Sequence, residues 1–397
     1  MNETTADYIR RHADDDIRQL ALKGTKDPDV DLPFALDQIA GRQTARRKVP
    51  AWAASDGIIF PPHLSMEQCS SEQTARYKAR LAGSGQRMVD LTGGFGVDFS
   101  FMAAGYQEPV YVEQQTVLCD IARNNFKLLG LRAEVVCGDA VDYLQQMPHA
   151  DLVYLDPARR DNQGQRTYGI SDCTPDVLAI RHLLLEKADR IVIKLSPMLD
   201  WRKAVSDLGA EYVSAVHIVS VQNECKELLV EMRPTPSPSP REGRLVCVND
   251  ATTFETRIAL TTQPLLPWGG VGGGFFLYEP NASIMKAGCF GAVAEAFGVS
   301  PLASNSHLFV SDRLVTDFPG RAFHIDTVTT MNKRELRTAL ADIRQANIAV
   351  RNFPLSVAQL RQRLKLSEGG STFIFATTLA DGSHVLLICS KTMKPAD

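Results

Sequence analysis

The chain has 397 residues, of which 44% are hydrophobic and 22% are charged. This composition excludes a disordered, fibrous or collagen-like protein, and the length predicts two or three domains with cores of their own. With 43 Lys and Arg against 46 Asp and Glu, the net charge of −3 shows no overall basic bias toward nucleic acid.

The cysteines and the N-terminus indicate the cellular compartment. The eight cysteines are widely spaced, so they provide neither a metal-ligand pair nor a disulfide framework. The first residues, MNETTADYIRRHADDD, are charged, and no apolar run is long enough to span a membrane. We therefore expect a cytoplasmic protein with reduced thiols, no metal and no membrane contact.

Residues 1–83 are expected to form a helical N-terminal region. Apolar residues recur with a helical period, as at Ile17 and Leu20, and proline-rich turns interrupt them. Near the end of this region the sequence SSEQ has the pattern of a capping box, with Ser70 at the N-cap and Gln73 three residues later. The sequence therefore predicts a helix that begins after Ser70.

Residues 84–233 are predicted to form an α/β domain with a parallel sheet. Short apolar runs alternate with helix-length segments, and the runs are RMVDL, PVYVE, AEVVC, DLVYLD and RIVIKLS. The segment TVLCDIARNNFKLLG predicts a crossover helix that buries Val117 and Leu128 and stops at Gly130. Two later runs, AVHIVSV and KELLVEM, are separated only by QNEC, which favours an antiparallel hairpin that closes the sheet.

The rest of the chain predicts two smaller α+β domains after a linker. The segment RPTPSPSPRE alternates proline with serine and threonine, which no packed element tolerates. Residues 243–325 form the first predicted domain, and residues 326–397 form the second, with a helix at 357–364 before the strands FIFATT and HVLLICS. The glycines of PWGGVGGGFF lack the phosphate-binding pattern, so a flexible loop is favoured there.

Acidic residues end four successive strands of the predicted parallel sheet. Asp90 and Glu113 end the first two strands, and Asp139 and Asp156 follow the next two. Because parallel strands bring their carboxyl ends to one edge, these carboxylates are expected to line one crevice. Glu113 is suited to accept hydrogen bonds from the two ribose hydroxyls of a nucleoside.

A glycine loop, DLTGGFGVD, follows the first of these strands. Gly93, Gly94 and Gly96 would let the backbone approach a ligand where a Cβ would clash. The dinucleotide pattern GxGxxG is incomplete, because Phe99 stands at the place of the third glycine. The residues by themselves leave both NAD and S-adenosylmethionine open as the ligand.

Five separated motifs together resemble a known family. EQCSSEQTARYK, DLTGGFGVD, LDPARRD, IKLSPMLD and NECKELL are similar to a bacterial group of class I S-adenosylmethionine-dependent methyltransferases. This group carries a ferredoxin-like segment and a C-terminal THUMP-like domain. The resemblance implies a Rossmann-like seven-strand sheet over 84–233 with an antiparallel closing hairpin, a ferredoxin-like domain over 243–325 and a THUMP-like RNA-binding domain over 326–397. It also implies that the substrate is RNA, either tRNA or rRNA.

The resemblance assigns cofactor-binding roles to residues of the acidic edge. The methionine part of S-adenosylmethionine would be held by the first strand end and its loop, the ribose by the second strand end and the adenine by the third. In that order the residues are Asp90 with Gly93, Gly94 and Gly96, then Glu113, then Asp139 with Ala140.

The resemblance also assigns catalytic roles to residues at the end of the fourth strand. The Asp156 carboxylate and the Pro157 carbonyl would accept hydrogen bonds from an exocyclic amine of guanine or adenine and aim its lone pair at the methyl group. The sequence departs from the family pattern, because Ala158 replaces a second proline and Arg159 replaces the aromatic residue that stacks on the base. The candidates for that stacking place are Arg159, Arg160, Tyr154 and Tyr168.

Several interpretations stay open. For Lys194, a side chain that reaches solvent is favoured over one that faces the crevice. Residues 333–365 hold eight basic residues against Glu335 and Asp342, a net charge of +6 that favours an RNA-binding surface over a merely solvated helix face. The alternatives are a small-molecule or protein methyltransferase, a non-catalytic RNA-binding factor on the same fold, and a nicotinamide oxidoreductase. The oligomeric state is not predicted.

Overall fold

The computed structural model describes residues 2–159, 169–235, 243–258, 274–303 and 305–392. Arg160, Tyr168, most of the proline-rich linker and most of the glycine-rich loop fall outside these ranges. The chain divides into two compact units, one of Met1–Val216 with Lys226–Pro240 and the other of His217–Cys225 with Arg241–Asp397. Each unit is described by itself below.

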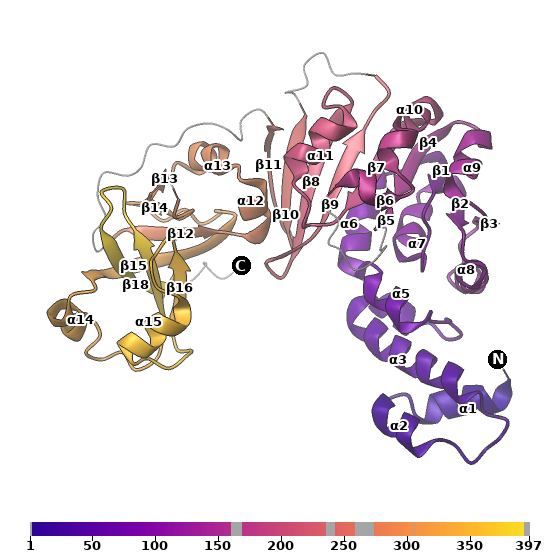
Figure 1. The fold of residues 1–397 in the computed structure, drawn as a ribbon, viewed down its shortest axis with the longest axis horizontal. Helices are drawn as coiled ribbons and strands as arrows, with labels where there is room; N and C mark the ends of the chain where they lie inside the picture. The colour runs from indigo at the N-terminus through magenta and orange to yellow at the C-terminus, as the bar shows by residue number, and fades with distance from the viewer. Residues whose placement is uncertain (1, 160–168, 236–242, 259–273, 304, 393–397) are drawn as a thin grey trace. The chain divides into compact units, whose positions relative to one another are not determined.

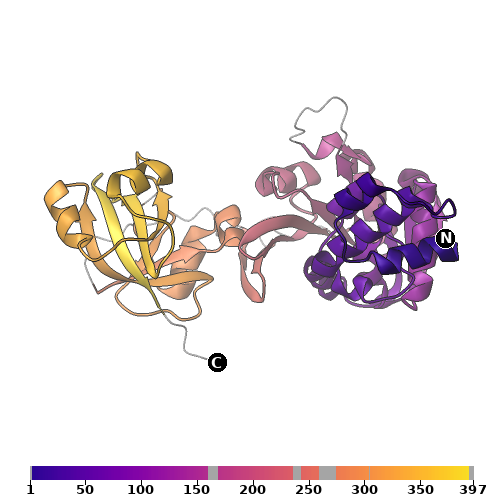
Figure 2. The same cartoon turned by 90° about the horizontal axis from the view of Figure 1, so that it is seen from below.

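The N-terminal part of the first unit is helical, as predicted. Its helices are α1 (Glu3–Arg11), α2 (Ile17–Lys23), α3 (Leu32–Lys48), α4 (Pro50–Ala53), α5 (His63–Gln68) and α6 (Glu72–Ala82). The first three pack on one another through buried apolar residues that include Tyr8, Leu20 and Ile39. Figures 1 and 2 show these helices side by side at the indigo end of the chain.

Helix α6 begins one residue later than the capping-box pattern predicts. Ser71 is the N-cap, and its hydroxyl oxygen accepts a hydrogen bond from the Thr74 amide at 3.3 Å. The Ser70 hydroxyl instead donates to Asp98 at 2.8 Å. The cap is displaced because a tertiary partner engages Ser70.

Two buried amide side chains hold the extended segment between α4 and α5 on both sides. The Gln38 side chain exchanges two hydrogen bonds with the backbone of Phe60, at 2.8 and 2.9 Å. The Asn125 side chain exchanges two more with the backbone of Ile59, at 2.8 and 2.9 Å. Gln38 lies on α3, whereas Asn125 comes from a helix beside the sheet, so the segment joins the N-terminal helices to the α/β part of the unit.

The α/β part has the predicted doubly wound topology with a closing hairpin. Its strands are β1 (Gly85–Asp90), β2 (Tyr106–Glu113), β3 (Glu134–Cys137), β4 (Ala150–Leu155), β7 (Ala188–Leu195), β8 (Val213–Val221) and β9 (Glu224–Met232). They are seven of the nine strands of one sheet, in which their order is β8-β9-β7-β4-β1-β2-β3. The pairs β1–β2, β1–β4, β2–β3 and β4–β7 are parallel, and β9 is antiparallel to β7.

Helices connect these strands and cover the sheet. They are α7 (Val97–Ala103), α8 (Thr116–Leu128), α9 (Ala140–Gln146), α10 (Val177–Lys187) and α11 (Trp201–Leu208). Two residues of α8 were assigned wrongly to its buried face, because Val117 is 63% exposed and Leu128 is 48% exposed. The buried face includes Asn125, whose amide is satisfied by the Ile59 backbone. A pattern of apolar residues leaves out a buried polar residue such as Asn125. The buried face of α8 was therefore predicted at the wrong angle around the helix axis.

The closing hairpin is tighter than the sequence suggested. Gln222 and Asn223 form the loop between β8 and β9, and both have positive φ angles, of 52° and 61°. Two consecutive left-handed residues give the turn whose twist matches that of the flanking strands. Glu224 and Cys225, which were expected in the loop, therefore belong to β9.

The second unit contains a short hairpin, which extends the nine-stranded sheet beside β8, and a separate mixed sheet. The hairpin strands are β10 (Arg244–Asn249) and β11 (Thr252–Arg257). The sheet has the order β13-β14-β12-β15-β18-β17-β16, with β12 (Phe276–Pro280), β13 (Ser300–Pro301), β14 (Phe309–Ser311), β15 (Gly320–Thr330), β16 (Asn347–Arg351), β17 (Thr372–Thr378) and β18 (His384–Lys391). Its helices are α12 (Ala282–Ala287), α13 (Phe290–Phe297), α14 (Lys333–Ala339) and α15 (Val357–Leu364). The last helix and the two strands after it were predicted correctly.

Two absences concern only the described ranges. None of the helices in those ranges combines the length and the apolar character that a membrane crossing requires. Within the same ranges, His, Cys, Asp and Glu side chains form no group that could hold a metal ion. The eight cysteines lie within these ranges, and no two of them are joined by a disulfide bond there.

Candidate functional site

The ends of β1 and β4 mark the point where the winding of the sheet changes direction. From β1 the chain continues through β2 and β3 on one side, whereas β4 is followed by β7 on the other. The Leu91 amide donates to the Tyr154 carbonyl at 3.1 Å, and the Asp156 amide donates to the Thr92 hydroxyl at 2.6 Å. Asp90 and Asp156 therefore lie on neighbouring strand ends, at the place where α/β sheets bind ligands.

Two of the three loop glycines are required by packing. A Cβ on Gly93 would lie 2.1 Å from the ring of Tyr111, and a Cβ on Gly96 would lie 2.8 Å from the ring of Phe126. Gly94, with a φ of +55°, meets nothing closer than the Thr92 carbonyl at 3.8 Å. Of these glycines, Gly94 is thus the one with open space beside its Cα, while its amide donates to Glu113 and its carbonyl accepts from the Tyr111 hydroxyl.

Glu113 and Asp139 stand at the next two strand ends, and each organises its own neighbourhood. The buried Glu113 accepts hydrogen bonds from the amides of Gly94 and Gln115, both at 2.9 Å, and so fixes the glycine loop against β2. Asp139 is the exposed N-cap of α9, which begins at Ala140, and one of its oxygens accepts from the Val141 amide at 2.7 Å. A carboxylate has about four acceptor positions, so both groups keep capacity for a ligand hydroxyl or amine.

Asp90 is a buried carboxyl group with other acids around it. Its Oδ1 atom accepts a hydrogen bond from the Thr92 amide at 2.9 Å. Burial raises the pKa of Asp90 well above its ordinary value, and the charges of Asp98, Asp156 and Glu113 raise it further, against the Thr92 hydrogen bond. A cation at this edge would therefore be favoured electrostatically.

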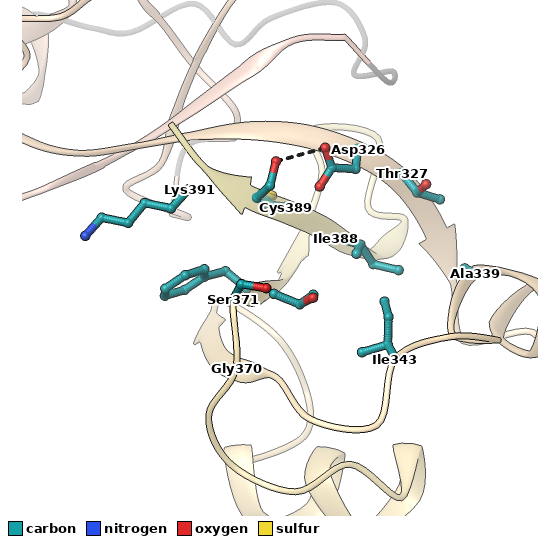
Figure 3. A pocket seen from close by; sticks show the side chains of 12 residues that line it. Asp326, Thr327, Ala339, Ile343, Gly370, Ser371, Ile388, Cys389 and Lys391 are labelled. Atoms are coloured by element: carbon teal, nitrogen blue, oxygen red, sulfur yellow. Dashed lines mark hydrogen bonds between the residues drawn. The ribbon is translucent and has the colours of Figure 1, made fainter. Parts of the chain in front are cut away.

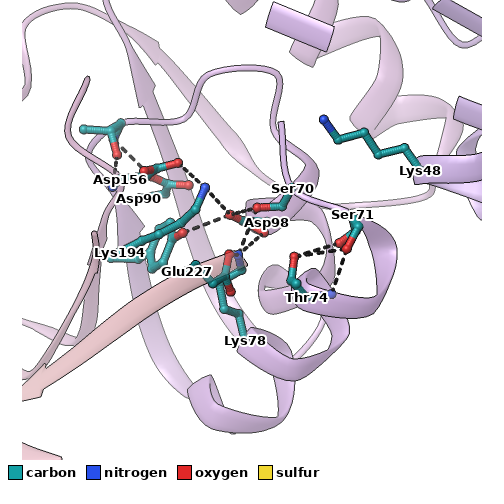
Figure 4. A network of polar contacts seen from close by, with 12 residues as sticks. Lys48, Ser70, Ser71, Thr74, Lys78, Asp90, Asp98, Asp156, Lys194 and Glu227 are labelled. Atoms are coloured by element: carbon teal, nitrogen blue, oxygen red, sulfur yellow. Dashed lines mark hydrogen bonds and ion pairs between the residues drawn. The ribbon is translucent and has the colours of Figure 1, made fainter. Parts of the chain in front are cut away.

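Five charged side chains of alternating sign connect this edge to the interior (Figure 4). We call this series the buried charge chain, and its order is Asp156, Lys194, Asp98, Lys78, Glu227. The shortest distances between successive charged atoms are 2.5, 3.9, 3.0 and 2.7 Å. The Lys78 side chain has 0% exposed surface, that of Lys194 has 14% and that of Asp156 has 40%. The series therefore runs from the crevice through a fully buried ammonium group to the buried carboxyl of Glu227.

Within the buried charge chain, ion pairing outweighs the cost of burying Asp98 and Lys194 in their charged forms. Burial opposes the charged form of Asp98, yet Lys78 and Lys194 lower the pKa of Asp98 below its ordinary value. Burial would likewise lower the pKa of Lys194, but the carboxylates of Asp156 and Asp98 raise it instead. Both groups are thus held in the ionised form.

At the inner end, the Glu227 carboxyl lies on the closing hairpin. Burial raises the pKa of Glu227, and the nearby ammonium of Lys78 counteracts this shift only in part. Because Lys78 lies on α6 and Asp98 on α7, the buried charge chain fastens two helices and the hairpin to the acidic edge of the sheet.

Most members of the buried charge chain were not predicted from the sequence. The expectation that Lys194 reaches solvent was wrong, because its ammonium lies against Asp156. Lys78, Asp98 and Glu227 were not predicted at all. A signal was present in the sequence for Lys194, a charged residue within the apolar strand run IVIKL, whereas Glu227 stands beside Lys226 at the start of its run, LLV.

The residues around Asp156 restrict the choice of a stacking side chain. Tyr154 is 1% exposed and its hydroxyl donates to Asp98 at 2.9 Å, so its ring does not face a substrate. Pro157 is buried. Ala158–Arg159 form the short strand β5, which pairs with β6 (Cys173–Thr174). The Arg159 side chain lies outside the described part of the structure, as do Arg160 and Tyr168.

Comparison with known proteins identifies the family. Residues 320–391 match a family described as THUMP domain-like, and residues 276–319 match a ferredoxin-like domain. The crystal structure of a protein from Porphyromonas gingivalis W83, assigned as a methyltransferase, has 31% sequence identity to this chain and a TM-score of 0.87. The similarity covers 98% of each chain. The chain belongs to the family of this protein and is a methyltransferase.

More distant structures share only part of the chain. TrmK of M. capricolum, solved with S-adenosyl-homocysteine, shows 12% identity and a TM-score of 0.32 over 41% of this chain and 68% of its own. PH1948 of Pyrococcus horikoshii, named as an RNA methyltransferase, shows 16% identity and a TM-score of 0.36 over 50% of this chain and 98% of its own. These similarities are too distant to support a functional conclusion. No relative was found among functionally curated proteins.

Replacing Lys78 with methionine tests the energetic role of the buried charge chain. Lys78→Met leaves Asp98 and Glu227 buried without the ammonium between them, and we expect the free energy of unfolding to fall by about 3–5 kcal/mol. The control is Lys203→Met, which removes an exposed pair with Asp207 and should cost at most about 1 kcal/mol. Urea unfolding followed by circular dichroism measures the free energy of unfolding of both variants. Equal losses in the two would contradict a stabilising role for the buried charge chain.

Replacing Asp90 with asparagine tests its raised pKa. A carboxyl group whose pKa is raised by folding contributes stability below its ordinary pKa and loses it as the pH rises through the folded value. The stability of Asp90→Asn relative to the unmodified chain should therefore increase from about pH 5 to about pH 8. Urea unfolding across this range measures the difference, with Asp37→Asn as the control for loss of an exposed carboxylate. A constant or falling difference would show that Asp90 is ionised without penalty.

Proposed function

We propose that the chain transfers a methyl group from S-adenosylmethionine to RNA, at an exocyclic amine of a purine base in tRNA or rRNA. The observation that carries this proposal is the row of carboxylates at the switch point of a methyltransferase sheet. Asp90 and Asp156 end neighbouring strands, and Glu113 and Asp139 stand at the next two strand ends.

The acidic edge fits the proposed cofactor. S-adenosylmethionine carries a positively charged sulfonium, which a row of carboxylates attracts, and its ribose hydroxyls and adenine amine are hydrogen-bond donors. Glu113 already holds the Gly94 amide and has acceptor capacity left for the ribose. Asp139 is exposed at the head of α9, which suits an acceptor for the adenine amine. Asp90, Gly93, Gly94, Gly96 and Ala140 complete the set that we propose as the cofactor site.

Asp156 and Pro157 are proposed to position the substrate amine. S-adenosylmethionine, when bound, supplies a methyl group that is already activated for transfer. The protein's task is then to orient the amine and exclude water, with the Asp156 carboxylate and the Pro157 carbonyl as acceptors. The Asp156 side chain is partly exposed at the strand edge, which leaves it accessible to a base. We propose Arg159 as the residue that contacts that base in place of an aromatic ring.

The THUMP-like segment supports RNA as the substrate. Lys333, Arg334 and Arg337 are exposed on α14. Two other members of the basic window are engaged internally, because Arg351 pairs with Glu279 at 2.8 Å and Arg361 donates to a backbone carbonyl. The six remaining basic residues, Lys333, Arg334, Arg337, Arg344, Arg363 and Lys365, are exposed and available for phosphate contacts.

An open groove of about 540 Å³ lies in the same segment (Figure 3). Its lining includes Ser371, Thr372 and Lys391, which offer hydroxyl and ammonium donors, and Phe373. Donors beside an aromatic ring are the groups that proteins use for phosphates and bases of single-stranded RNA. The groove is therefore compatible with the proposed RNA contact.

Cofactor binding is tested by changing the ribose and adenine acceptors. We expect Glu113→Ala with Asp139→Ala to weaken the affinity for S-adenosylmethionine by about a hundredfold or more, since each lost hydrogen bond to a charged group costs about 1.5–3 kcal/mol. Isothermal titration calorimetry measures the affinity. Asp31→Ala, which removes a helix cap on α3 in the same way, is the control. Unchanged affinity in the double variant would refute the cofactor site.

Methyl transfer is tested with Asp156→Ala. Transfer of labelled methyl from S-adenosylmethionine to total cellular RNA should be lost in this variant while cofactor binding survives, because Asp156 contacts the substrate rather than the cofactor. Undiminished transfer would remove Asp156 from the mechanism. A wild-type protein that binds the cofactor without labelling RNA would favour a small-molecule or protein substrate, and one that does not bind the cofactor would favour a non-catalytic factor.

A further inference from the structure

We propose that Lys194 is a positioning residue for methyl transfer, which fixes the Asp156 carboxylate so that one chosen oxygen faces the substrate amine. The inference rests on the proposed function, since it assumes that Asp156 receives the amine. It starts from the contact between the Lys194 ammonium and Oδ2 of Asp156, at 2.5 Å.

The contact distinguishes the two oxygens of Asp156. A charge-assisted hydrogen bond to Oδ2 holds the plane of the carboxylate, and Oδ1 is then the oxygen presented to a ligand. The backbone on the same residue is also fixed, because the Asp156 amide donates to the Thr92 hydroxyl at 2.6 Å. The main chain of Asp156 is thus held by the glycine loop and its side chain by β7.

Lys194 is itself prevented from turning away. Asp98 lies behind it, with Oδ2 3.9 Å from the ammonium. That carboxylate is immobilised in turn by Lys78 at 3.0 Å, by the Ser70 hydroxyl at 2.8 Å and by the Tyr154 hydroxyl at 2.9 Å. A lysine side chain is ordinarily flexible, so this restraint is what makes it suited to a positioning role.

The position of Lys194 on its strand makes it possible to distinguish a positioning role from simple ion pairing. The same strand, β7, carries a second basic residue, Arg190, which pairs with the buried Glu231 at 2.9 Å. Arg190 lies toward the amino end of the strand, whereas Lys194 is next to its last residue. The two residues therefore provide a matched comparison of a paired cation away from the reacting groups and one beside them.

Lys194→Met and Arg190→Met form the test, with methyl transfer to RNA measured as kcat and KM. A misplaced reacting group costs up to about 100-fold in rate, so we expect Lys194→Met to lower kcat by about 10- to 100-fold. The KM for RNA and the affinity for S-adenosylmethionine should change by less than about threefold. Arg190→Met should leave kcat within about threefold of the unmodified chain, and Lys194→Arg should restore part of the lost rate.

A double-mutant cycle with Asp156→Asn decides whether Lys194 acts through Asp156. If it does, adding Lys194→Met to Asp156→Asn should lower kcat little further. Independent, multiplying effects would overturn the proposal, as would a Lys194→Met kcat equal to that of the unmodified chain. Circular dichroism checks folding, and Lys194→Gln replaces the methionine variant in the same cycle if that variant does not fold.

The outcomes also separate this inference from the proposed function. An active wild type with an equally active Lys194→Met variant overturns the positioning role alone. A wild type that transfers no methyl to RNA overturns the proposed function and the positioning role together.

Discussion

The structure depends on an ammonium group with no exposed surface. Lys78 reaches Asp98 on α7 at 3.0 Å and Glu227 on β9 at 2.7 Å, from its own place on α6. Taking a charge out of water is expensive, and here two carboxylates at close range and a hydrogen bond from Lys78 to the Ser70 hydroxyl, at 2.9 Å, offset that cost. Because Asp98 follows the glycine loop directly, fixing Asp98 also fixes the loop. One buried group therefore determines where the N-terminal helices and the hairpin meet the acidic edge.

Several residues of the acidic edge have a structural task as well as the proposed chemical one. Glu113 holds the Gly94 amide, and Asp139 caps α9. Gly93 and Gly96 give room to the rings of Tyr111 and Phe126. These local bonds come from the protein itself and fix the shape of the loop and the strand ends. The same carboxylates are then already oriented when a ligand arrives, which is the meaning of preorganisation at this site.

What the sequence could predict follows from local periodicity. Strand runs and helix-length segments were sufficient to place Asp90, Glu113, Asp139 and Asp156 at one edge, since parallel topology alone brings strand ends together. Ion pairs between residues distant in the sequence could not be predicted. Lys78 and Glu227 are 149 residues apart, and Lys194 and Asp156 are 38 apart. A buried charge looks like a solvated one until its partner is known, which is why Lys194 was assigned to solvent.

The distribution of charge matters more than the small net charge of the chain. A site that attracts a sulfonium with carboxylates also repels the phosphates of RNA, so a polyanionic substrate needs cations away from those carboxylates. The exposed basic residues of α14 and its surroundings belong to the THUMP-like segment, whereas the acidic edge belongs to the first unit. Lys194 serves the remaining need, because it compensates the charge of Asp156, the acidic residue proposed to contact the base. For the proposed reaction, the residues suited to the cationic cofactor and those suited to the polyanionic substrate thus belong to different segments of the chain.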